Sequence, residues 1–187
     1  MFRIAAPLAL ILLAACGNDG PRYLIDTGPT RPDAVQRVSV ATLEIMDVSL
    51  PAYAEDSEIM LENDNGALVA VDNALWADDP QRAVTQLLTD EIARTSTATT
   101  ASEPWPLENP PQAAVHVRVS EMVARENGTL DLRGQYAISS YGYVIRERIE
   151  RFDISVPLPD TSPAAIANAS GLALRQLAAD VVQTLSR

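Results

Sequence analysis

The sequence holds very little of the chemistry that catalytic and metal-binding proteins commonly use. It has one cysteine and one histidine among its 187 residues. A single cysteine excludes an intramolecular disulfide, and one histidine leaves too few ligands for most zinc sites. The chain also lacks a Gly-x-Ser-x-Gly nucleophile elbow and a glycine-rich phosphate-binding loop. We therefore predict that the protein is not an enzyme and holds no metal or cofactor.

Positive charge is scarce as well, and lysine is absent. The chain has 14 basic residues, all arginine, against 25 acidic residues, which gives a formal net charge of −11 and a pI near 4.4. This balance repels phosphate backbones, so we expect no nucleic-acid partner. Aromatic residues make up only 5%, but the apolar fraction of 47% is enough for a hydrophobic core. The length suits one domain with a tail.

No apolar run is long enough to cross a membrane, but a short one lies at the N-terminus. One arginine precedes the apolar segment 4–13, which leads to Leu-Ala-Ala-Cys at 13–16. This pattern is typical of a secretory signal, and a transmembrane helix would need about 20 apolar residues. Segment 13–16 resembles the bacterial lipobox, which implies that Cys16 is lipidated and becomes the new N-terminus. The alternative is an ordinary signal peptide followed by a free cysteine.

These features predict three segments. Residues 1–15 form the signal peptide, residues 16–34 the lipidated cysteine with a flexible tether, and residues 35–187 a single periplasmic domain. The tether is rich in Gly, Pro, Asp and Asn. Gly17 follows the cysteine, and by resemblance to enterobacterial sorting signals this favours the outer membrane over the inner one.

Hydrophobic periodicity predicts three strands, a helix, three strands and a final helix within the domain. The predicted strands cover residues 37–48, 58–61, 67–71, 115–119, 130–138 and 144–156. The first helix begins after Asp79 and the second after Ser162, each with a proline at its first position. We therefore predict an α+β fold with one mainly antiparallel sheet of about six strands and two helices packed on one face, in the order βββαβββα.

The sheet face away from the helices should be polar. His116 is the only general-base candidate with an ordinary pKa near neutrality, and we interpret it as an exposed strand residue. A polar face suits water or a wet protein contact, so we expect no deep acyl-chain pocket and predict docking or self-association through sheet edges and loops. The predicted residues of this face are His116, Arg118, Asp131, Arg133 and Gln135.

The ordered combination of features resembles a known family. The residues that carry it are the lipobox, segment 23–25, the first strand with Leu-Pro-Ala-Tyr at 50–53, segment 58–60, Leu-Trp-Ala-Asp at 75–78, the helix through 83–88, the strand 115–119 and the C-terminal helix. Together they resemble the PqiC-like ABC-type transport auxiliary lipoproteins. The chain departs from the family pattern after Trp76, where Asp78, Asp79 and Pro80 lengthen the step before the helix by one residue.

The resemblance implies an accessory, non-catalytic component of an MCE/ABC-type lipid transport system, anchored in the outer membrane and facing the periplasm. Its implied partners are an MCE-domain protein and the associated permease, with self-association into a ring around a lipid conduit. Trp76 and Tyr53 are the candidate partner-binding residues, although Trp76 also suits a core position under the first helix. Two alternatives remain open: a lipoprotein hydrolase with an unrecognised site, and a lipid carrier.

Overall fold

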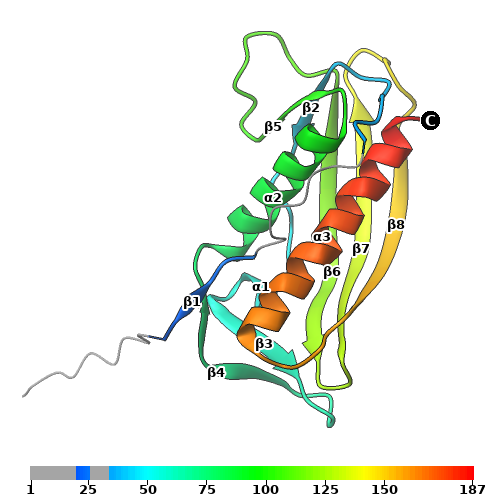
Figure 1. Ribbon diagram of the computed structural model, residues 1–187. Coiled ribbons are helices and arrows are strands. Elements are labelled where there is room, and N and C mark those ends of the chain that lie inside the picture. The colour runs from blue at the N-terminus through cyan, green and yellow to red at the C-terminus, as the bar shows by residue number, and fades with distance from the viewer. Residues whose placement is uncertain (1–19, 26–33) are drawn as a thin grey trace, which may run out of the picture.

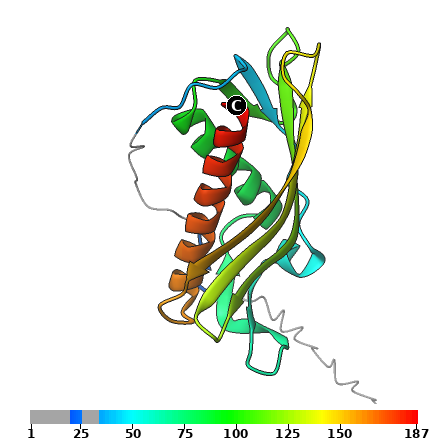
Figure 2. The same ribbon diagram turned by 90° about the vertical axis from the view of Figure 1, so that its right-hand side faces the viewer.

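The computed structural model describes residues 20–25 and 34–187, which form one eight-stranded sheet with two long helices against one of its faces (Figures 1 and 2). The predicted α+β class and the placement of both long helices on one face are confirmed. The elements are β1 (Arg22–Tyr23), β2 (Thr42–Ile45), α1 (Ala52–Glu55), β3 (Glu58–Glu62), β4 (Leu68–Trp76), α2 (Pro80–Thr95), β5 (Thr99–Ser102), β6 (Ala113–Arg125), β7 (Thr129–Ser140), β8 (Arg148–Pro157) and α3 (Pro163–Leu185).

Both long helices begin where their capping residues predict. The Asp79 carboxylate accepts a hydrogen bond from the Arg82 backbone N–H at 2.8 Å. At α3, the Ser162 hydroxyl oxygen accepts one from the Ala165 N–H at 3.2 Å. Each cap satisfies a donor that the first helical turn leaves without an intrahelical partner. The apolar stripes of the two helices pack over the sheet, and their largest fully buried side chains are Val84, Leu88, Ile92, Leu174 and Leu177.

The three longest strands form the predicted antiparallel meander. β6 pairs with β7, and β7 with β8, and β8 lies at the edge of the sheet (Figure 1). The turns fall at the predicted glycines, where Gly128 has a φ of +90° and Gly142 a φ of +80°. Glycine adopts this left-handed backbone region without steric cost.

The other edge of β6 differs from the prediction in its details. β2 pairs with the first part of β6 and β3 with its last part, and both pairings are parallel. The short strands β5 and β1 extend these two halves by parallel pairing with β2 and β4. The sheet is therefore mixed and has two more strands than the predicted six, because neither short strand has enough residues to show a periodicity of its own.

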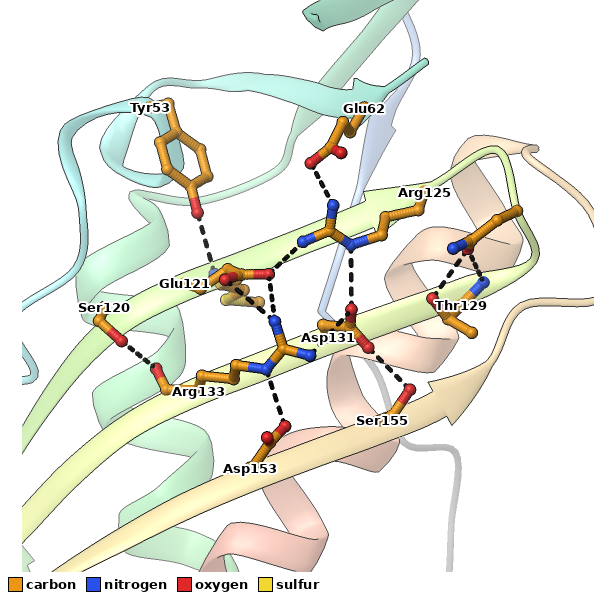
Figure 3. Close-up of polar contacts among 12 residues, drawn as sticks. Tyr53, Glu62, Ser120, Glu121, Arg125, Thr129, Asp131, Arg133, Asp153 and Ser155 are labelled. Carbon is orange, nitrogen blue, oxygen red and sulfur yellow. Dashed lines mark hydrogen bonds and ion pairs between the residues drawn. The ribbon is translucent and has the colours of Figure 1, made fainter. Parts of the chain in front are cut away.

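A β-bulge in β6 changes which of its side chains face the helices. The pairing register with β7 shifts between Val119 and Glu121. The extra residue reverses the alternation beyond it, so Glu121 and Arg125 join the sheet face away from α2 and α3 (Figure 3). Gly134 lies opposite Val119, and no side chain fits there, because a Cβ atom would come within 2.7 Å of Phe152 Cζ and closer still to the Arg118 carbonyl oxygen.

Candidate functional site

A groove of about 320 Å³ lies beside β1, between the first described residues and helix α2. Residues 23–25 form one wall, and Ala83 and Leu87 on α2 are part of the other. Trp76, at the end of β4, lines the groove but is only 8% exposed and belongs to the hydrophobic core. The sequence-based interpretation of Trp76 as a core residue therefore agrees with its burial.

Backbone hydrogen bonds hold β1 against the end of β4. The Leu75 N–H donates to the Pro21 carbonyl at 3.2 Å, and the Ala77 N–H donates to the Tyr23 carbonyl at 2.8 Å. Gly20 is required for this close approach, because a Cβ atom there would come within 2.6 Å of the Asn73 carbonyl oxygen. Residues 20–25, which lie within the predicted tether of residues 16–34, are thus fixed beside Trp76.

Tyr53, the second candidate partner-binding residue, fills a gap in the sheet. The Val119 N–H donates to the Ser49 carbonyl oxygen, and β3 begins to pair with β6 only at Ala124. Between these points the Met122 N–H donates to the Tyr53 hydroxyl at 3.1 Å (Figure 3). Partial burial raises the pKa of Tyr53 above its ordinary value. Tyr53 therefore satisfies a backbone donor that neither neighbouring strand reaches.

The structure brings Trp76 and Tyr53 to the same place. Both line a small cavity of about 30 Å³ beneath the groove, together with Met122 and residues of α2 and α3. A cavity of this size is too small for a drug-sized ligand, which needs about 300 Å³ or more. Trp76 and Tyr53 thus lie where the β1 edge meets the core. Their role in partner binding stays a prediction.

Three acidic side chains line the groove. They are Asp78, Asp90 and Glu91, and no arginine is among the described residues that line it. The hydrogen bond from Arg82 holds the pKa of Asp78 below its usual range. Glu91 forms ion pairs with side chains of Arg94 and Arg175. Two of the three acids are therefore paired with arginines, and the described lining itself offers no basic side chain to the phosphate group of a phospholipid.

Two arginines organise an ion-pair network on the sheet face away from the helices (Figure 3). Arg125 donates to Asp131 at 2.9 Å and also pairs with Glu121 and Glu62. Burial works against the charged form of Arg125, but its hydrogen bonds to Asp131 and Glu121 raise its pKa above the ordinary value. Arg125 thus links β3, β6 and β7.

The second arginine of the network, Arg133, extends it to the sheet edge. Arg133 donates to Asp153 on β8 at 2.8 Å and to Glu121 at 3.1 Å. Asp131 also accepts a hydrogen bond from the Ser155 hydroxyl at 2.7 Å. Asp131 and Arg133 lie on this face, as the sequence predicts. Their acidic neighbours Glu121 and Glu62 were not predictable, because the bulge and the long-range pairing of β3 bring them here.

The remaining predicted face residues are open to solvent or nearly so. His116 and Arg118 are exposed, and Gln135 is half-buried. The His116 Nε2 lies 3.0 Å from the Ser139 hydroxyl oxygen, but no carboxylate among the described residues is bonded to the ring. A serine–histidine pair without an orienting acid or an enclosing cavity lacks the parts of a catalytic triad.

Within residues 20–25 and 34–187, no group of three or more His, Cys, Asp or Glu side chains is placed to hold a metal ion. In the same residues, no helix is long and apolar enough to cross a membrane. Cys16, the predicted lipidation site, lies outside the described residues.

Solved structures share the fold. One, described as an uncharacterized protein, has a TM-score of 0.68 and 14% identity and covers 82% of this chain and 96% of its own. Protein XCC0632 from Xanthomonas campestris has a TM-score of 0.64 and 16% identity, with coverage of 89% and 92%. At these identities the likeness establishes the fold alone. No curated protein sequence matches the chain.

The family is established by sequence. The family model described as the ABC-type transport auxiliary lipoprotein component matches residues 23–182, which span β1, the sheet and almost all of α3. The match begins at Tyr23 in β1, the strand that is held beside Trp76. It includes both Tyr53 and the arginine network. The chain therefore belongs to the family of ABC-type transport auxiliary lipoprotein components.

Proposed function

We propose that this protein is a non-catalytic accessory lipoprotein of an MCE/ABC-type phospholipid transport system, anchored in the outer membrane and facing the periplasm. Membership of the ABC-type transport auxiliary lipoprotein family carries the proposal. The lipobox-like segment ending at Cys16 supplies the anchor, and the MCE-domain protein and its permease are the proposed partners.

The position of β1 supports a domain held close to its membrane. Five residues lie between Cys16 and Arg22, the first residue of β1, so six residue-to-residue steps separate the two. An extended chain spans at most about 3.3–3.6 Å per residue, so six steps reach about 20 Å. The β1 edge of the domain therefore lies within about 20 Å of a lipid on Cys16. We expect the opposite end of the domain to project away from that membrane.

The proposal favours a scaffold over a hydrolase. The one serine–histidine contact, His116 with Ser139, lies on an exposed sheet face and not in a cavity. A hydrolase would enclose its nucleophile, base and oxyanion donors around one reacting atom. The hydrolase alternative predicts that replacing His116 removes an activity, and the scaffold predicts no such loss.

The groove beside Trp76 is a feature that bears on the lipid-carrier alternative. Its volume of about 320 Å³ lies at the lower end of pockets that hold drug-sized ligands, and a two-chain phospholipid is larger than such ligands. Its described lining contains no basic side chain to bind a phosphate group. A carrier would retain phospholipid through purification, and we expect the purified domain to contain none by mass spectrometry.

Co-purification from membranes tests the proposal. We expect the full-length protein, solubilised from the outer-membrane fraction, to recover an MCE-domain protein of the same cell. The Cys16→Ser variant is the matched control, because it keeps the folded domain and removes the anchor. Absence of the MCE-domain protein from the wild-type sample would refute the proposed function.

A further inference from the structure

The end of the molecule farthest from β1 carries a group of arginines in an otherwise acidic protein. Two adjoining hollows, of about 230 and 830 Å³, share Ser39 and Val144 in their walls. The first is lined by Arg146, Arg148 and Arg187, and the second by Arg37. Of the described side chains that line the two hollows, none is acidic. We call this end the apex.

These four arginines have no ion-pair partner among residues 20–25 and 34–187, in contrast to Arg125 and Arg133. The arginines of the sheet network are each held by several carboxylates. The nearest acid in the sequence, Glu147, is engaged locally, because its Oε1 accepts the Ser140 N–H at 3.0 Å. In a chain of net charge −11, an uncompensated basic surface favours an acidic partner.

The turn between β7 and β8 adds apolar side chains to the apex. Tyr143 is 94% exposed, and Tyr141 and Val144 are about half exposed. Tyr143 also has a φ of +60°, which is an unfavourable left-handed conformation for a bulky residue. Strained, fully exposed aromatic residues are typical of functional surfaces, and tyrosine and arginine are enriched among interface hot spots.

The apex and β1 lie at opposite ends of α2. β1 pairs with Leu75 and Trp76, immediately before α2, whereas Thr97, just after its last turn, lines the larger hollow. The 16 residues of α2 separate them by about 24 Å at 1.5 Å per residue. Figures 1 and 2 show the C-terminus and the β7–β8 turn together at this end, away from β1. The apex is thus the part of the domain directed away from a lipid on Cys16.

We infer that the apex is the docking surface for an acidic segment of the MCE-domain partner, with Arg146 and Arg148 pairing with its carboxylates and Tyr143 packing on its apolar side chains. This inference rests on the proposed function and names the surface through which it operates. It differs from the predicted role of Trp76 and Tyr53, whose side chains face the cavity and the core at the other end.

Charge reversal at the apex tests the inference. Membrane co-purification is repeated with the double variant Arg146→Glu/Arg148→Glu and with the control Arg118→Glu/Arg151→Glu. The control changes the net charge by the same amount as the apex variant. Its two arginines are exposed, lie on the sheet and also have no ion-pair partner among the described residues. We expect the apex variant to recover at least about tenfold less MCE-domain protein than wild type, and the control to stay within about twofold.

A second variant keeps the test informative if charge reversal disturbs folding. Tyr143→Gly removes the exposed ring and places glycine at a positive φ, so its unfolding midpoint should be at least that of wild type. We expect this variant also to recover less partner. Equal losses in the apex and control variants, or none in either, would overturn the inference and leave the proposed function standing.

Two other outcomes have distinct meanings. A wild-type protein that recovers no MCE-domain protein would refute the proposed function and the inference with it. Light scattering of the purified mature domain addresses a second copy as the occupant. A wild-type oligomer that becomes monomeric on Arg146→Glu/Arg148→Glu, with partner recovery unchanged, would assign the apex to self-association and overturn the inference.

Discussion

Replacement of Gly134 by alanine isolates the contribution of the β6 bulge to stability. Gly134 lies opposite Val119, where the register of β6 and β7 shifts. A Cβ atom at this position would lie 3.0 Å from Val119 Cα, 2.7 Å from Phe152 Cζ and closer still to the Arg118 carbonyl oxygen. Two of these three neighbours are backbone atoms, which move only if the sheet pairing itself changes.

The expected cost follows from overpacking. An added methyl group in a packed interior costs about 1–3 kcal/mol, and more where the neighbours resist movement. Because β6 and β7 are interior strands of the sheet, we expect Gly134→Ala to lower the free energy of unfolding by about 3 kcal/mol or more. For a domain of this size the unfolding midpoint falls by about 2–4 °C per kcal/mol, so the expected shift is about 6–12 °C.

Gly66→Ala is the matched control. Gly66 has a φ of +76°, but no atom lies within 4 Å of the point that a Cβ atom would occupy there. The only penalty is the left-handed conformation of alanine, about 1–2 kcal/mol, partly offset by reduced entropy of the unfolded chain. Thermal and urea unfolding of the soluble domain measure both variants. A Gly134→Ala midpoint as high as that of Gly66→Ala would refute the close approach at the bulge.

The other predictions concern the anchor, the sheet gap, the core and the ion-pair network. Cys16→Ser should release the protein from membranes, as fractionation would show; mass spectrometry that finds an unmodified thiol in the wild-type mature protein would contradict lipidation. Tyr53→Phe should lower the free energy of unfolding by about 1–3 kcal/mol in urea titrations, because the Met122 N–H loses its acceptor, and an unchanged midpoint would mean that water replaces the hydroxyl. Trp76→Ala should cost about 3–5 kcal/mol as a core truncation, whereas lost partner recovery at an unchanged midpoint would favour a contact role. Arg125→Ala should lower the free energy of unfolding by about 1–3 kcal/mol in the same titration, because Glu62 loses its ion pair and the other acids keep only Arg133, and a cost below about 1 kcal/mol would show that solvent screens the network.

The starts and turns of the elements were predictable because their causes are local. Asp79 and Ser162 cap helices through atoms three residues away, and the glycines at 128 and 142 supply positive φ within their own turns. Such signals depend on a few neighbouring residues and survive in the sequence as short patterns. The family assignment also rested on the order of such patterns along the chain.

The sequence by itself thus determined the α+β class, the starts of the two long helices, the meander of the last three strands, the family and the acidic balance of the chain. Only the tertiary structure decided that β2 and β3 share one edge of β6, that Tyr53 closes the gap between them, and that four arginines meet at the apex. The physical reason is sequence separation. Arg37 and Arg146 come together through pairings between segments more than 100 residues apart, and nothing in either segment's local pattern records its distant neighbour.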